Sequence, residues 1–139
     1  MAGTEPMPET LRLVTFAVAG CRFAADADQL AEVRAYDRDR DQDDLFWLQR
    51  TLFPTKVPAP VAGILAIKGL PVPVKVAIER LDALLEVGID AIRPLPPLMA
   101  ARVHRNGVWG VVPAGEVLLL LLDLHKLWEV SFAATVDRR

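Results

Sequence analysis

The fold is decided by residues 90–128, which contain Ile92-Arg93-Pro94-Leu95-Pro96-Pro97-Leu98 and, further on, Glu116-Val117-Leu118-Leu119-Leu120-Leu121-Leu122-Asp123-Leu124. Three prolines stiffen the first segment and bias the residues before them toward extended geometry, so we expect a strap that crosses a surface without forming a helix. The second segment has six consecutive apolar residues, too few to span a membrane. This run predicts a strand that is covered on both faces.

Length and composition are those of one globular domain. The chain has 139 residues, and 53% of them are hydrophobic, which is enough for a real core. Its 16 Lys and Arg against 18 Asp and Glu give a net charge of −2, so no global positive field would hold nucleic acid or an acidic membrane surface. We therefore expect neither nucleic-acid binding nor membrane insertion.

The single cysteine and the start of the chain both favour a cytoplasmic location. Cys21 has no partner for a disulfide within the chain and cannot form a cysteine cage for zinc, which fits a reducing compartment. The first residues lack the basic start and apolar run of a secretory signal. With two prolines, two glutamates and few large apolar groups, residues 1–10 are expected to be a disordered tail before a domain over residues 11–130, and residues 131–139 a C-terminal tail.

The first half of the chain predicts a hairpin. Residues 11–19 are rich in β-branched and aromatic side chains, and Gly20 supplies a turn before a return strand over residues 21–24. In residues 27–33, Leu30 and Val33 are at helical spacing, which indicates a short helix or a bent strand.

The charged run at residues 37–44 has the alternating acids of an EF-hand at Asp37, Asp39 and Asp41. However, Gln42 replaces the glycine that the calcium loop needs, and Leu48 replaces its bidentate glutamate. We interpret the run as a solvated connector whose charges neutralise one another. Apolar residues at helical spacing then predict a short amphipathic helix over residues 45–52.

The second half predicts a series of strands. Residues 61–68 and 71–80 are two β-rich runs that reverse at Gly69, and prolines at the start of the second run place that end at a sheet edge or at a bulge. The pattern continues over residues 81–87, with Leu84, Leu85 and Val87 as core candidates. Three further strands are expected at residues 99–104, 108–112 and 117–122, the first two joined at an Asn106-Gly107 turn.

Four segments resemble CheW-like domains in sequence and in order: residues 81–87, 92–98, 108–111 and 117–124. The resemblance covers residues 61–128 well and residues 11–33 more weakly. It implies a mainly β fold in which two small SH3-like β-barrels, with short helices, form one CheW-like domain. It also implies a scaffold that has no cofactor.

The family carries a Gly-x-x-Asn-x-Arg-Gly hairpin in its first half, and two alignments of this chain with it are possible. In the one we favour, the charged run leads directly to residues 44–48 and that hairpin is missing. In the other, residues 60–69 form the hairpin, with Ala66 and Lys68 in place of the asparagine and arginine.

Nothing in the sequence indicates catalysis. The two histidines, His104 and His125, have no metal-ligand spacing with each other. Cys21 is better explained as a small packed side chain than as a reactive thiol. No nucleophile elbow and no phosphate-binding glycine loop is present in the sequence. We expect no catalytic, cofactor-binding or metal-binding residues and no enzymatic activity.

The resemblance implies an adaptor that couples the cytoplasmic tip of a chemoreceptor to the regulatory domain of a CheA-type histidine kinase, with other CheW-like domains or a second copy as further partners. The alternative is a diverged domain that has lost this coupling and self-associates or regulates another partner. Family members use a groove between the barrels for a receptor helix and the barrel ends for the kinase.

Candidate partner-binding residues lie on three segments: Phe46, Trp47, Ile64, Ile67, Lys68, Leu70, Val72, Val74 and Arg93. For the isoleucines and valines, packing in the core is the competing interpretation. For Arg93 it is a contact with Asp90.

Overall fold

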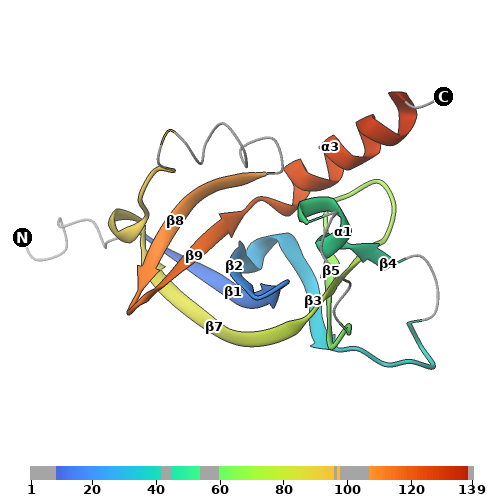
Figure 1. The fold of residues 1–139 in the computed structure, drawn as a ribbon, viewed down its shortest axis with the longest axis horizontal. Helices are drawn as coiled ribbons and strands as arrows, with labels where there is room; N and C mark the ends of the chain where they lie inside the picture. Colours follow the sequence, from blue (N-terminus) through green and yellow to red (C-terminus); the bar gives the residue numbers. More distant parts are fainter. Residues whose placement is uncertain (1–8, 42–44, 54–59, 96, 98–106, 138–139) are drawn as a thin grey trace, which may run out of the picture.

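The computed structural model describes residues 9–41, 45–53, 60–95, 97 and 107–137, which form two β-sheets (Figure 1). The five-stranded sheet has the order β7-β1-β2-β9-β8, and the four-stranded sheet has the order β3-β5-β6-β4. The strands are β1 (Thr10–Val18), β2 (Cys21–Asp26), β3 (Leu30–Ala35), β4 (Leu45–Trp47), β5 (Gly63–Ile67), β6 (Val74–Ile78), β7 (Arg80–Gly88), β8 (Val108–Ala114) and β9 (Val117–Leu122).

The expected mainly β class with two sheet subdomains is confirmed. Among the described residues, one sheet has five strands and the other has four. Among the described residues, no pairing joins the two outer strands of either sheet, so neither closes into a hydrogen-bonded barrel.

The core lies between the sheets. It contains Phe16 and Phe23, whose rings stack with centroids 5.9 Å apart, together with Leu65 and Val76 from the smaller sheet. A smaller apolar cluster, which includes Leu121, is formed by alternate residues of the five-stranded sheet. The sheet therefore buries side chains on both faces, as the continuous apolar sequence of β9 requires.

Strand β9 is central, as expected, and pairs in parallel with β2 and antiparallel with β8. Burial on both faces fails at Leu118, which is 54% exposed. Leu118 precedes Leu120, the residue at which pairing with β2 begins.

Residues 92–95 of the proline segment are an extended strap, as predicted, whereas the prediction fails at Pro97, which is helical. Arg93 donates to and accepts from the backbone of Val111, over 2.8 and 2.9 Å, and so adds one bridge to β8. Gly110 permits this close approach, because a Cβ atom there would lie 3.1 Å from the carbonyl oxygen of Arg93.

The first hairpin is also as predicted. Ala19 and Gly20 have φ angles of 52° and 79°, the positive values that a two-residue hairpin turn needs at both central positions. After β2 the chain forms a short 3-10 helix, η1 (Ala27–Gln29), and then enters β3. Residues 27–33 therefore combine the two alternatives, a helical turn and a strand.

The predicted reversal of the two β-rich runs at Gly69 is confirmed. Strands β5 and β6 pair antiparallel around a turn in which Gly69 has a φ angle of 83°. Both alignments with the family contain this reversal, so it does not decide between them. The prolines were expected to place the start of the second run at a sheet edge or at a bulge, and this is wrong. Strand β6 starts at Val74, after Pro73, and is an interior strand between β5 and β4.

A second correction concerns residues 45–52. The first three form β4, which pairs in parallel with β6, and the helix α1 (Leu48–Leu52) begins only after them. The apolar side chains of the segment suit both structures, and Leu48 is buried at the start of the helix. Residues 45–47 form a strand because they pair with the edge of β6 that β5 leaves free.

The described chain ends in helix α3 (Leu124–Asp137), which projects from the sheets toward the C-terminus (Figure 1). Its start is capped by Asp123, whose carboxylate accepts a hydrogen bond from the amide of Lys126 at 3.1 Å. The helix continues over residues 131–137, which the sequence suggested to be a tail. The strand expected at residues 99–104 and Asn106 of the expected turn lie outside the described residues.

Candidate functional site

The candidate site is a groove between the two sheets, on the side where β3 and β7 form their edges. Its volume is about 410 Å³. The chain crosses between the sheets on both sides of it, from β2 through η1 into β3, and from β6 into β7. The groove is lined by Val14, Thr15, Ala27, Leu30, Ala31, Glu32, Val33, Leu81, Asp82, Ala83 and Leu84.

Two large apolar side chains stand exposed on the groove walls. Val33 on β3 is 41% exposed, and Leu84 on β7 is 59% exposed. Leu84 was expected in the core, and this is wrong because adjacent strand residues point to opposite faces, so that Leu85 packs inward. Isolated exposed apolar residues are ordinary, but two that border one apolar groove indicate a docking surface.

A β-bulge shapes the floor of the groove. Thr15 pairs with Ala83 and Phe16 pairs with Leu81, which leaves Asp82 as the extra residue of β7. The buried Thr15 hydroxyl donates to the carbonyl of Ala83 at 3.1 Å and accepts from its amide at 3.0 Å. The Thr15 side chain therefore links β1 to β7 beside the bulge.

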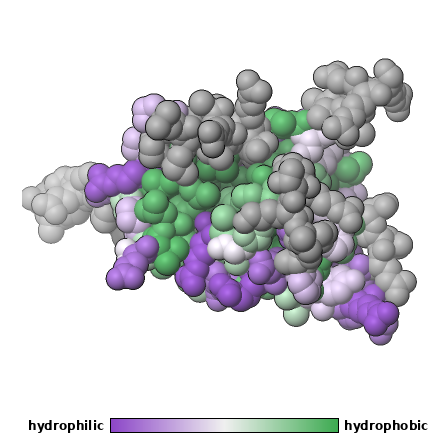
Figure 2. Space-filling model, in the orientation of Figure 1, coloured by the Kyte–Doolittle hydropathy of each residue, from purple (hydrophilic) through white to green (hydrophobic). Residues whose placement is uncertain are grey.

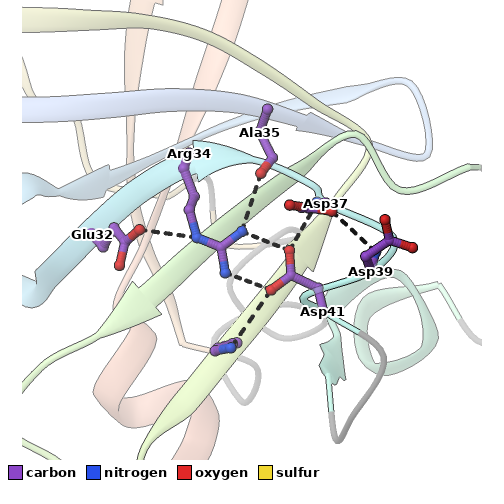
Figure 3. A network of polar contacts seen from close by, with 7 residues as sticks. Glu32, Arg34, Ala35, Asp37, Asp39 and Asp41 are labelled. Atoms are coloured by element: carbon purple, nitrogen blue, oxygen red, sulfur yellow. Dashed lines mark hydrogen bonds and ion pairs between the residues drawn. The ribbon is translucent and has the colours of Figure 1, made fainter.

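An ion network holds the groove wall formed by β3 (Figure 3). The guanidinium of Arg34 donates to both carboxylate oxygens of Asp41, over 2.6 and 2.5 Å. Asp41 also accepts from the amide of Asp37 at 2.9 Å and lies 3.6 Å from the amine of Lys75 on β6. The described end of the charged connector is thereby tied to both β3 and β6.

The network corrects our interpretation of the charged connector as fully solvated, because the side chain of Asp41 is completely buried. Hydrogen bonding from Arg34 holds the pKa of the Asp41 carboxyl well below its usual range. The same bond raises the pKa of Arg34, which stays charged. Asp41 therefore has a structural role, which is to join β3, the connector and β6, and the spacing of the acidic residues could not indicate it.

The candidate partner residues lie elsewhere. Ile64, Ile67 and Val74 are buried, which supports the core-packing interpretation for them. Around the β5–β6 turn, Lys68 is exposed, Leu70 is half-buried and Val72 is 51% exposed.

The other three candidates lie on two further elements. Phe46 and Trp47 are half-buried on β4, and Arg93 is exposed beside β8. No ion pair between Arg93 and Asp90 is found among the described residues. None of the nine candidates lines the groove.

The groove residues were missed because the sequence does not show which strands become edges. One signal was present: Leu84 and Leu85 are adjacent on a strand, so one of them had to point away from the core. Val33 gave no comparable signal, because its spacing from Leu30 also suits a helix.

Other site types find little support in the described residues. They contain no group of three His, Cys, Asp or Glu side chains arranged to hold a metal ion. A search of the described helices finds none with the length and hydropathy needed to cross a membrane. Cys21 is half-buried, and His125 uses its Nε2 atom in a 2.7 Å hydrogen bond to the carbonyl of Lys68.

The two sheets, their crossover connections and the groove between them define a CheW-like fold. A solved structure with this fold, the scaffolding protein TtCheW from Thermoanaerobacter tengcongensis, matches with a TM-score of 0.67 over 88% of this chain and 94% of that one. The two sequences are 16% identical. No protein-family model matches the sequence. No curated protein matches it either.

Proposed function

We propose that this protein is a non-enzymatic cytoplasmic adaptor of a chemosensory or motility system, which couples the cytoplasmic tip of a chemoreceptor to a CheA-type histidine kinase. The observation that carries the proposal is the apolar groove between β3 and β7. The fold supports it, because the matching structure is that of a scaffolding protein.

The groove has the properties of a helix-binding site. Its open shape and apolar walls suit an amphipathic helix that places side chains at positions i, i+3, i+4 and i+7 against Leu30, Val33 and Leu84. Both walls are built on strands that are fixed within their sheets. Docking would therefore need little rearrangement of the backbone, which lowers the entropic cost of binding.

The kinase is assigned to a separate surface. The exposed residues at the β5–β6 turn, with Val72 at their centre, lie outside the groove and can contact a second partner while a receptor helix is bound. A protein that couples a receptor to a kinase must be able to bind both partners at the same time.

The experiment measures binding of a chemoreceptor tip fragment and of a CheA-type regulatory domain by isothermal titration calorimetry. Val33→Glu and Leu84→Glu should each weaken receptor binding about 10- to 100-fold, because a carboxylate replaces an apolar contact, and should leave kinase binding unchanged. Leu118→Glu is the matched control on an exposed leucine outside the groove. A wild-type protein that binds neither partner would overturn the proposal.

A second candidate function is self-association, and one surface favours it. Figure 2 shows apolar surface gathered over β8 and β9. Trp109 and Leu118, which belong to these strands, are 44% and 54% exposed. Light scattering at high concentration tests this candidate: a dimer that Leu118→Glu dissociates supports it, and a monomer at all concentrations excludes it.

A further inference from the structure

We propose that the helix accepted by the groove carries lysine or arginine side chains beside its apolar stripe. This inference rests on the proposed docking function and adds the charge of the partner. The charged residues that line the groove are Glu32 and Asp82, one on each wall, and both are acidic. No lysine or arginine is among the described residues that line it.

On the β3 wall, Glu32 shares its ion-pair partner Arg34 with Asp41. Arg34 gives both of its terminal nitrogens to the buried Asp41 and reaches Glu32 with Nε alone, at 3.0 Å. Of the two carboxylates that contact Arg34, Asp41 is buried and the side chain of Glu32 is 49% exposed, so the carboxylate that faces the solvent at the groove is that of Glu32.

The second cation of the network is Lys75, which lies on β6 and contacts Asp41 at 3.6 Å. With it, the two acids and two bases of the network carry no net charge. Neither Arg34 nor Lys75 is among the residues that line the groove, whereas Glu32 is. The charged group that a partner in the groove meets on this wall is therefore the carboxylate of Glu32.

On the β7 wall, Asp82 contacts Arg80 through Nε and Oδ1 at 2.7 Å. The Arg80 side chain is 57% exposed and does not line the groove, whereas that of Asp82 is 21% exposed and does. Acids on opposite walls can be reached by basic residues on the two flanks of one helix. Such rim charges mainly set the orientation and the rate of association of a partner.

The test uses two lactam-stapled amphipathic helical peptides with the same leucine and valine stripe, one flanked by lysines and one by glutamates. Fluorescence anisotropy at low salt should show about tenfold tighter binding of the lysine peptide, the size expected for two exposed charge pairs. The preference should shrink as salt increases. It should reverse in a Glu32→Lys, Asp82→Lys double variant.

Two further variants keep the test decisive. Glu32→Gln with Asp82→Asn removes the charges without introducing repulsion and should leave both peptides binding about equally. Glu116→Lys, an exposed change in the β8–β9 turn, alters net charge away from the groove and should keep the lysine preference. Thermal unfolding by circular dichroism establishes that each variant is folded.

The outcomes separate the two proposals. Equal binding of both peptides by the wild-type protein, or tighter binding of the glutamate peptide, overturns the charge inference and leaves groove docking intact. Failure of both peptides to bind overturns the inference together with the docking function. A lysine preference that survives neutralisation of Glu32 and Asp82 shows that other charges cause it and also overturns the inference.

Discussion

The hydroxyl of Thr15 and the backbone of Ala83 exchange two hydrogen bonds at the point where β1 and β7 shift register. Ala83 and the bulged Asp82 lie on one wall of the groove, and Thr15 lies at its floor. One buried threonine therefore contacts β7 beside its bulge and also lines the candidate site.

Thr15→Val is expected to reduce the free energy of unfolding by about 1–2 kcal/mol, because valine keeps the volume and leaves the amide and carbonyl of Ala83 without this partner. Urea unfolding measures the loss. Thr10 lies on the same strand as Thr15, and Thr10→Val, which removes an exposed hydrogen bond to Glu86 on β7, should cost about 0.5 kcal/mol or less. Equal losses in the two variants would contradict the role of Thr15.

Asp41 predicts a specific dependence of stability on pH. Its pKa is lower in the folded protein than in the unfolded chain, so its contribution is fully present above the unfolded value of about 4 and is lost as pH falls below it. Asp41→Asn should be less stable than the wild type at pH 7, and the difference should shrink toward pH 2. Asp39→Asn, at an exposed carboxylate, is the control. A difference that stays constant with pH would refute the assignment.

Gln29 joins η1 to the start of α3. Its side chain donates to the carboxylate of Asp123 at 2.9 Å and accepts from the amide of Leu124 at 3.0 Å. Gln29→Ala should cost about 1–2 kcal/mol and should increase amide exchange in the first turn of α3. Asp28→Ala, at the exposed neighbouring residue, should leave that exchange unchanged. Similar exchange in both variants would count against this junction.

Two glycines with positive φ angles provide a matched pair. At Gly107, with φ of 86°, a Cβ atom would lie 2.8 Å from the carbonyl oxygen of Asp123, whereas at Gly115, with φ of 65°, nothing lies within 4 Å. Gly115→Ala should cost about 1–2 kcal/mol from backbone strain alone. Gly107→Ala should cost about 1–3 kcal/mol more, because the clash adds to the strain. Equal melting temperatures for the two variants would refute this difference.

Local sequence predicted the elements whose pattern suits only one structure. The Ala19-Gly20 hairpin, the extended strap before Leu95 and the apolar strand β9 are of this kind. The pattern failed where two structures share it. The apolar spacing at the β4–α1 boundary fits a strand as well as a helix, and the pairing with β6 decided it.

The candidate site was harder to predict, because it depends on contacts between segments that are distant in sequence. Nothing near Leu84 shows that β7 is an edge strand, and nothing near Asp41 shows that Arg34 lies beside it. The exposure of Leu84 and the pairing of Asp41 with Arg34 arise only when the sheets have formed.

The central claim is that the groove between β3 and β7 binds a receptor helix, and NMR chemical-shift mapping tests it most directly. A chemoreceptor tip fragment is added to the isotope-labelled protein, and amide and methyl shifts are followed. The account predicts the largest shifts at Val33, Ala83 and Leu84, with little change at Trp109 and Leu118. The largest shifts at Trp109 and Leu118, with the groove residues unchanged, would contradict it.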